Sequence, residues 1–192
     1  MTLEAASGAP CTTEDAAEQV IAATRHWLEK AVVGLRLCPF AAVPFARGQI
    51  RYCVSGQTTT EGLARELTGE LEQLYAADPE LCETSLLIHP YVLTDFADYN
   101  QFLDEADAAI ADLDLRGELQ IASFHPDYRF AGSAPNDVQN YSNRSPYPML
   151  HLLREASVTR AVATYPEIDQ IGERNRATLL ELGHEGWREL LR

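Results

Sequence analysis

The hydrophobic positions of the chain follow helical and strand-like spacing in turn over most of its length. From residue 12 to residue 33, apolar side chains recur every three or four positions, which predicts a helix that ends near Gly34. Two further helical stripes follow Thr58 and Thr94, residues of a type that caps helices. Short apolar runs between and after these helices predict three buried strands: Ile50–Ser55, Thr84–His89 and Leu119–His125.

This order of elements is typical of βαβ units. Helices of such length between strands favour parallel pairing with right-handed crossovers. We therefore predict an α/β fold: a three-stranded, mostly parallel βαβαβ sheet flanked by helices, with an N-terminal helix and a C-terminal helical segment. An antiparallel α+β sheet with a similar element order is the alternative. Residues 1–11 are predicted to be a flexible tail and residues 12–192 a single α/β domain.

The regular pattern breaks after the third predicted strand. Residues 126–147 show no periodicity and contain prolines, asparagines and aromatic residues, which is typical of an ordered, functional loop. Beyond the loop, Pro148–Ala156 is predicted to be a short helix, because proline suits the first helical turn. A second helix is predicted from Ser157 and a long one from Pro166 to about Leu191.

Composition and charge narrow the class of protein. The 192 residues are 46% hydrophobic, which is enough for a folded core, and their formal net charge is −14. An acidic chain of this kind is not expected to bind nucleic acid or an anionic membrane surface, and no apolar run reaches the roughly 18 residues of a membrane span. The four cysteines include no Cys-x-x-Cys pair, and no secretory signal is recognisable. We expect an acidic, cytoplasmic protein that binds a small molecule; the sequence indicates no particular cofactor and no oligomeric state.

Two histidines close predicted strands. His89 ends the second strand and His125 the third, and in open parallel sheets ligands bind beyond the carboxyl ends of the strands. Both side chains are therefore expected in one crevice, as candidate catalytic residues. His125 is the candidate general acid or base because imidazole titrates near neutral pH. The alternative is that both histidines cap strands and bond to the backbone.

Arg144 is the candidate anchor for an anionic group. Ser145 can cap the helix predicted after it, so Arg144 is expected at a helix N-terminus, where backbone N–H groups already favour an anion. Asn143, Ser145, Tyr128 and His151 are the candidate substrate-binding residues around it. The alternative is an arginine that holds the loop by bonding to carbonyl groups.

A metal site is a further possibility. His151 and Glu155 are four residues apart and share a face of the predicted helix, a spacing that suits a metal and equally an ordinary side-chain pair. Together with His89 and His125 they are the candidate ligands of a catalytic zinc or iron. No tightly bound structural metal is expected, because no cysteine has a ligand partner at finger-like spacing. Cys38 is interpreted as a small buried residue in a tight Cys-Pro turn.

Three sequence blocks resemble those of a bacterial domain family of unknown function. They are LCPFA at residues 37–41, FHPDYRFAG at residues 124–132 and NRSPYPMLHLLREASV at residues 143–158. The resemblance runs from about residue 25 to residue 191. It implies a stand-alone bacterial protein but assigns no activity and no catalytic residue.

The residues themselves favour a small cytoplasmic enzyme that acts on an anionic small molecule by histidine acid/base chemistry with arginine anchoring. One alternative is a metalloenzyme with histidine ligands to zinc or iron. The other is a non-catalytic ligand-binding or interaction protein whose aromatic loop packs on a partner.

Overall fold

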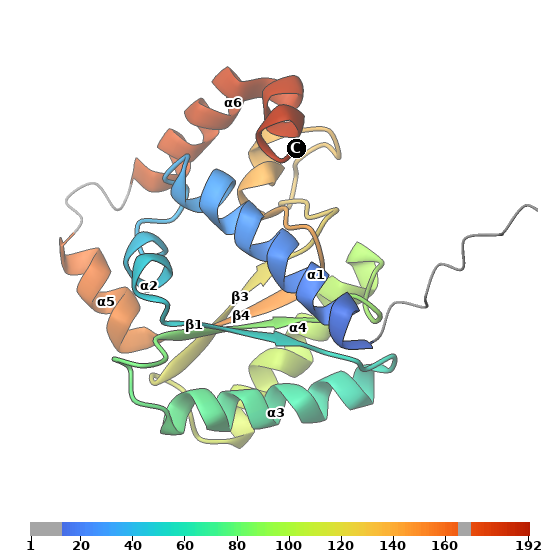
Figure 1. The fold of residues 1–192 in the computed structure, drawn as a ribbon, viewed down its shortest axis with the longest axis vertical. Coiled ribbons are helices and arrows are strands. Elements are labelled where there is room, and N and C mark those ends of the chain that lie inside the picture. Colours follow the sequence, from blue (N-terminus) through green and yellow to red (C-terminus); the bar gives the residue numbers. More distant parts are fainter. Residues whose placement is uncertain (1–12, 165–169) are drawn as a thin grey trace, which may run out of the picture.

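A computed structural model describes residues 13–164 and 170–192. Its centre is a four-stranded sheet in the order β1-β2-β4-β3 (Figure 1). The strands are β1 (Ile50–Val54), β2 (Thr84–Ile88), β3 (Leu119–Phe124) and β4 (Met149–Arg154). β1 and β2 are parallel neighbours, whereas β4 runs antiparallel to β2 on one side and to β3 on the other.

The α/β class and the first three strands are as predicted, but the prediction of a three-stranded, mostly parallel sheet is wrong. The segment predicted as the helix Pro148–Ala156 contains β4, which lies between β2 and β3 and makes the sheet mixed. Because β4 is a central strand covered on both faces, its sequence MLHLLR is a nearly continuous apolar run. Periodicity alone does not distinguish such a run from a segment of buried helix.

Helices occupy most of the remaining chain. They are α1 (Thr13–Trp27), η1 (Leu28–Val33), α2 (Ala42–Arg47), α3 (Thr60–Ala76), α4 (Phe96–Asp112), η2 (Val138–Asn143), α5 (Glu155–Thr164) and α6 (Ile171–Leu190). η1 continues α1 as a π-helical segment, and η2 is a 3-10 helix within the long loop. The predicted tail at residues 1–11 and the predicted helix start at Pro166 lie outside the described residues.

Two capping side chains show how the helices start. The Thr59 hydroxyl accepts a hydrogen bond from the Gly62 N–H group and caps α3, and the Asp95 carboxylate caps α4 in the same way. Each cap lies one residue after the predicted one. No helix of the described part is both long and apolar enough to cross a membrane.

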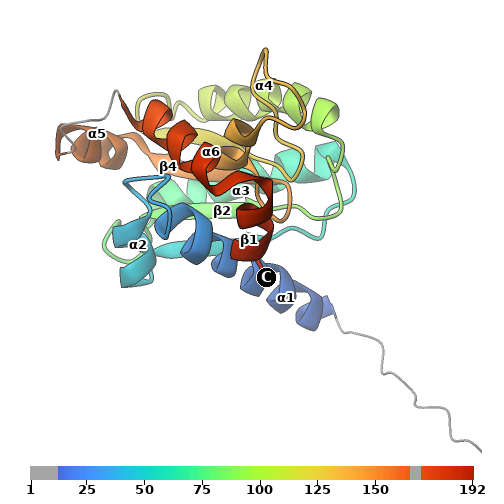
Figure 2. The same ribbon diagram turned by 90° about the horizontal axis from the view of Figure 1, so that it is seen from above.

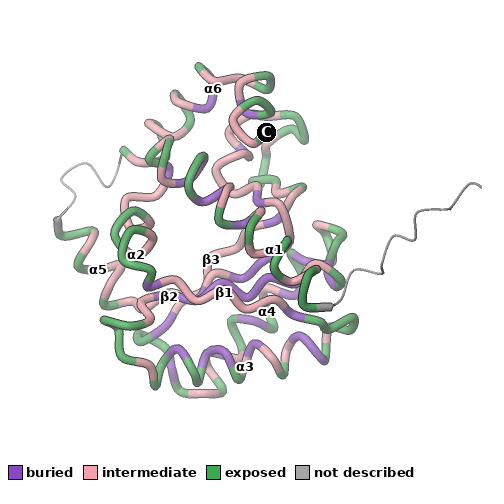
Figure 3. The backbone as a smooth tube through the Cα atoms, in the orientation of Figure 1, coloured by how far each residue is buried: buried purple, intermediate pink, exposed green. Residues whose placement is uncertain are grey.

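The helices cover the sheet on both faces. α3 and α4 pack on one face, and α1, η1 and α6 lie over the other (Figures 1 and 2). Buried residues gather in the sheet and along the helix sides turned toward it (Figure 3). In β4 the side chains alternate, so that Leu150 and Leu152 join the core under α3 and α4, whereas Met149 joins the core under α1. His151 therefore belongs to the α1 face of the sheet.

Candidate functional site

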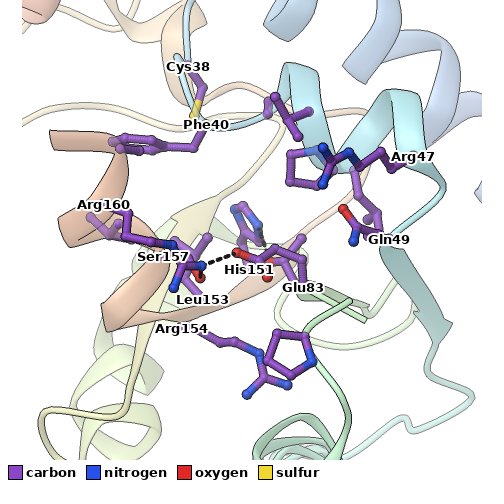
Figure 4. Close-up of a pocket in the computed structure, with 18 of the residues that line it drawn as sticks. Cys38, Phe40, Arg47, Gln49, Glu83, His151, Leu153, Arg154, Ser157 and Arg160 are labelled. Carbon is purple, nitrogen blue, oxygen red and sulfur yellow. Dashed lines mark hydrogen bonds and ion pairs between the residues drawn. The ribbon is translucent and has the colours of Figure 1, made fainter. Parts of the chain in front are cut away.

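A cavity of about 650 Å³ lies on the α1 face of the sheet, between α2 and α5 (Figure 4). It lies at the end of the sheet where β1 and β2 begin and the antiparallel β4 finishes, because Ile50, Thr84 and Arg154 all line it. Its apolar walls come from Leu28, Phe40, Val43, Pro44, Ile50, Leu86, Leu153, Val158 and Ala161. Both the volume and the apolar lining are typical of a small-molecule site.

His151 contributes its ring to this cavity. Its Nε2 atom lies 2.7 Å from the Oγ1 atom of Thr84, and that Oγ1 atom lies 2.5 Å from the carbonyl oxygen of Leu152. A carbonyl only accepts hydrogen bonds, so the single hydroxyl proton of Thr84 is donated to Leu152. The hydroxyl must then accept from His151, which places the imidazole proton on Nε2 and leaves a lone pair on Nδ1.

The lone pair on His151 Nδ1 is available to the cavity. Nδ1 has no hydrogen-bond partner among the described residues, and it is not one of the unpartnered polar atoms that are sealed from solvent. Burial lowers the pKa of His151 to about 4, because the charged imidazolium is poorly solvated there. The ring is therefore neutral at pH 7, and Nδ1 is a hydrogen-bond acceptor.

The charged side chains of the cavity lining differ in whether they bind other groups of the protein. Arg154 donates from Nη2 to three backbone carbonyls, those of Leu74, Ala77 and Cys82, and so ties β4 to the end of α3. Arg160 pairs with Glu83 at 3.4 Å. Arg47, on α2, makes no hydrogen bond or ion pair with any described residue, and Asp78 and Glu80 supply exposed carboxylates nearby in the lining.

Cys38 also lines the cavity, together with Pro39 and Phe40. Burial raises the pKa of its thiol, although the N–H groups of Phe40 and Ala41 act in the opposite direction. The thiol is therefore protonated at neutral pH. The half-buried cysteine lies in a turn before α2, as the sequence indicates, but its position in a cavity wall was not predicted.

The strand ends hold the other two candidate histidines. His89 and His125 lie on the α4 face of the sheet, with ring centroids 5.8 and 5.1 Å from that of Tyr99. Both are fully buried, at 0% exposure. His125 accepts from the Asp127 N–H group at 3.0 Å and lies 3.2 Å from the Leu93 carbonyl, so both ring nitrogens bond to backbone groups.

His89 is only half engaged. Its Nδ1 atom lies 2.9 Å from the Val92 carbonyl, and its Nε2 atom is sealed without a partner. Burial lowers the pKa of His89 to about 4 and lowers that of His125 as well. The structure thus places both rings beside Tyr99 on one side of the sheet and encloses them, so neither opens into a crevice.

Arg144 lies in the loop that precedes β4 and binds the loop's own backbone. Its Nε atom donates to the Tyr128 carbonyl at 3.2 Å, its Nη2 atom to the Pro135 carbonyl at 2.6 Å, and its guanidinium lies 5.1 Å from the ring centroid of Tyr141. No helix follows, because the next regular element is β4. The position expected for Arg144 at a helix N-terminus is therefore wrong.

The neighbours Asn143 and Ser145 also donate hydrogen bonds to backbone carbonyls. Asn143 donates to the Ser123 carbonyl at 3.1 Å, and the Ser145 hydroxyl donates to the Tyr147 carbonyl at 2.6 Å instead of capping a helix. The Tyr128 ring packs against Phe96. These bonds order residues 126–147 as a loop held by its own polar groups.

The candidate metal ligands do not come together. His151 lies on the opposite face of the sheet from His89 and His125, and Glu155 begins α5 instead of sharing a helical face with His151. Within residues 13–164 and 170–192, no group of three or more histidine, cysteine or acidic side chains is arranged to hold a metal ion.

Residues 19–189 match the family model described as "Protein of unknown function (DUF1415)". The chain belongs to this family. The resemblance to a family of unknown function is thereby confirmed. No curated protein and no solved structure matches the chain.

In this DUF1415 chain the cavity draws on two of the three sequence blocks. Cys38 and Phe40 come from the first block, and His151, Arg154 and Val158 from the third. The second block lies at the opposite end of the strands, where β3 finishes.

The DUF1415 cavity contains residues that sequence reasoning missed. The sequence pattern predicts Thr84 only as the first residue of a strand, and Arg47 is not among the candidate residues. Thr84 did carry a signal, because a polar residue in a fully buried strand requires a hydrogen-bond partner. Arg47 carried none, since an exposed arginine is ordinary.

Proposed function

We propose that this protein is an enzyme that binds a small organic molecule in the cavity beside His151 and uses His151 Nδ1 as the acid/base group. The observation that carries the proposal is the open Nδ1 atom of a neutral histidine, fixed by Thr84 in a cavity with mainly apolar walls. A base of this kind accepts a proton from a bound molecule and returns it in a later step. Arg47 is the candidate anchor for an acidic group of that molecule.

The proposal keeps the histidine acid/base chemistry expected from the sequence and places it at a different histidine. His125 bonds to the backbone through both ring nitrogens and is fully buried, whereas His151 has a free nitrogen at a cavity. The free thiols of Cys38, Cys53 and Cys82 accord with the bacterial cytoplasm that we propose as its location.

A second candidate is a ligand-binding protein without catalysis. The specific observation in its favour is the pKa of about 4 for His151, since a general base works best when its pKa is near the working pH. A bound anion would raise the pKa of His151. The enzyme requires such a rise toward the working pH, whereas the ligand-binding protein does not.

The test is a thermal-stabilisation screen of the full chain against a metabolite library, because a ligand that binds only the folded state raises its stability. Hits are repeated on Val158→Trp, which fills the cavity from α5, and on Val162→Trp, which makes the same change one turn later on the same helix at a 41% exposed site. We expect stabilisation to vanish in the first variant and persist in the second. Hits that bind both variants equally would overturn the proposal.

Catalysis is then tested on the same hits. Each is incubated with the wild-type chain and with His151→Phe, and the products are followed by mass spectrometry. Turnover that His151→Phe abolishes supports the enzyme; binding without turnover in the wild-type chain supports the second candidate.

A further inference from the structure

We infer that the ligand of this cavity presents a hydroxyl or N–H hydrogen-bond donor to His151 Nδ1 from a ring-sized or larger body that is apolar apart from this donor and the acidic group that Arg47 would hold. This inference rests on the proposed function and specifies its substrate class. The evidence is the hydrogen bonding of the polar groups in the cavity and the apolar character of its walls.

The polarity of the His151 contact is fixed by Thr84. The Thr84 hydroxyl donates to Leu152 at 2.5 Å and so accepts from His151 Nε2 at 2.7 Å. If the ring proton were on Nδ1 instead, Nε2 and the Leu152 carbonyl oxygen would be two acceptors that face the single hydroxyl proton of Thr84. The cavity therefore meets a lone pair at Nδ1 and not a proton, and the complementary ligand atom must carry the hydrogen.

Two polar side chains of the cavity lining donate to protein groups. The Gln49 side chain donates to the Glu80 carbonyl at 2.8 Å, and Arg160 donates to the Ser157 hydroxyl at 2.9 Å. Asp78 and Glu80 carry carboxylates at exposed positions of the lining, whereas His151 Nδ1 is an acceptor without a protein partner beside the apolar walls.

The walls determine the rest of the molecule. Phe40, Val158 and Leu153 face the same space as His151, and a polar body placed against them would lose its hydration without replacing it. A molecule of the same shape without a donor leaves Nδ1 desolvated and unpaired. A site built around one such bond discriminates against the analogue that lacks it.

The experiment uses matched pairs of probes that differ only in the donor: phenol and anisole, indole and 1-methylindole, benzyl alcohol and benzyl methyl ether. Each is titrated into the full-length, isotope-labelled chain while two-dimensional NMR spectra are recorded. We expect the donor of each pair to shift the resonances of His151 and Val158 and to bind about tenfold more tightly than its methylated partner.

Variants place that preference at one atom. His151→Phe keeps an aromatic ring without Nδ1 and should make the two members of each pair bind equally. Val158→Trp should abolish binding of both, and Val162→Trp should leave the preference unchanged.

The possible failures are distinguishable. If the methylated probes bind as tightly as the donors, or if His151→Phe keeps the preference, the inferred ligand class is wrong while the cavity remains a binding site. If no probe shifts a cavity residue of the folded wild-type chain, the proposed function fails with it.

Discussion

The Thr84 hydroxyl accepts a hydrogen bond from Nε2 of His151, across the antiparallel pair of β2 and β4. Thr84 begins its strand and is 5% exposed, and its other bond is to the carbonyl of the residue after His151. One hydroxyl group therefore sets both the orientation of the ring and the position of its proton. The chemistry available in the cavity depends on this pair.

Replacing Thr84 tests that dependence. Thr84→Val keeps the shape of the side chain but removes the acceptor, so either ring nitrogen of His151 can carry the proton. We expect the tenfold preference for donor probes to fall to about twofold, with a loss of about 1–2 kcal/mol in the free energy of unfolding. Thr84→Ser restores a hydroxyl and should retain the preference; a preference that survives in Thr84→Val would show that Thr84 does not fix the proton.

Stability is expected to fall as the solution becomes acidic. The folded chain holds His151 and His89 with pKa values of about 4, below the ordinary value of 6.5, and the pKa of His125 is lowered in the same direction. Between pH 6.5 and 4 the unfolded chain therefore binds protons that the folded chain does not. The stability that these neutral histidines contribute is fully present above pH 6.5 and is lost progressively as the pH falls toward 4. The loss is up to about 3 kcal/mol each for His151 and His89.

Urea unfolding between pH 7.5 and 5 measures this effect. His151→Phe has no imidazole at that position, so its stability should depend less steeply on pH than that of the wild-type chain. Equal slopes for the two proteins would contradict the lowered pKa of His151.

Arg51 and Glu70 form an ion pair on the α3 face of the sheet. Two hydrogen bonds of 3.0 Å join them, and the Ser85 hydroxyl donates to the same carboxylate at 3.1 Å. Burial alone would raise the pKa of Glu70, but the hydrogen bonds and charge of Arg51 lower it. Arg51→Met leaves a carboxylate that is 8% exposed without its cation and should cost about 2 kcal/mol, since Arg51 itself is partly solvated.

The control for Arg51→Met is Arg65→Met on the exposed side of α3. Chemical denaturation of both variants should show a change below about 0.5 kcal/mol for the control. Equal losses would show that the ion pair adds nothing to stability.

Arg144 is expected to act on the loop and not on the ligand. Its guanidinium holds the carbonyls of Tyr128 and Pro135, so Arg144→Ala should lower the free energy of unfolding by about 2 kcal/mol. Arg129, exposed and without a hydrogen bond to a described residue, offers the matched control Arg129→Ala. If Arg144→Ala instead removes ligand-induced stabilisation while its fold stays intact, the site lies at the strand ends.

The sequence was sufficient to predict the elements whose periodicity or caps are plain. The strands β1 to β3 and the helices α3 and α4 lie close to their predicted ranges, because alternating helices and buried strands follow from local patterns. β4 was not predicted, since its apolar residues serve two cores at once and Pro148 imitates a helix start. Only tertiary packing decides between the two conformations there.

The error at β4 carried over to the site. With residues 148–156 as a helix, His151 was paired with Glu155 and directed toward the strand ends. As a strand, the same residue faces the opposite side of the sheet and lies beside Thr84, which is 67 positions earlier in the chain. No local pattern connects two residues at that separation, so His151 was found as a candidate but its partner was not.

The most direct measurement is the long-range ¹H–¹⁵N spectrum of the His151 imidazole in the wild-type chain at pH 7, with His151→Phe to assign the signal. We predict a neutral ring with its proton on Nε2 and an unprotonated Nδ1 whose resonance moves when phenol is added. A proton on Nδ1, or a charged ring at pH 7, would contradict this prediction.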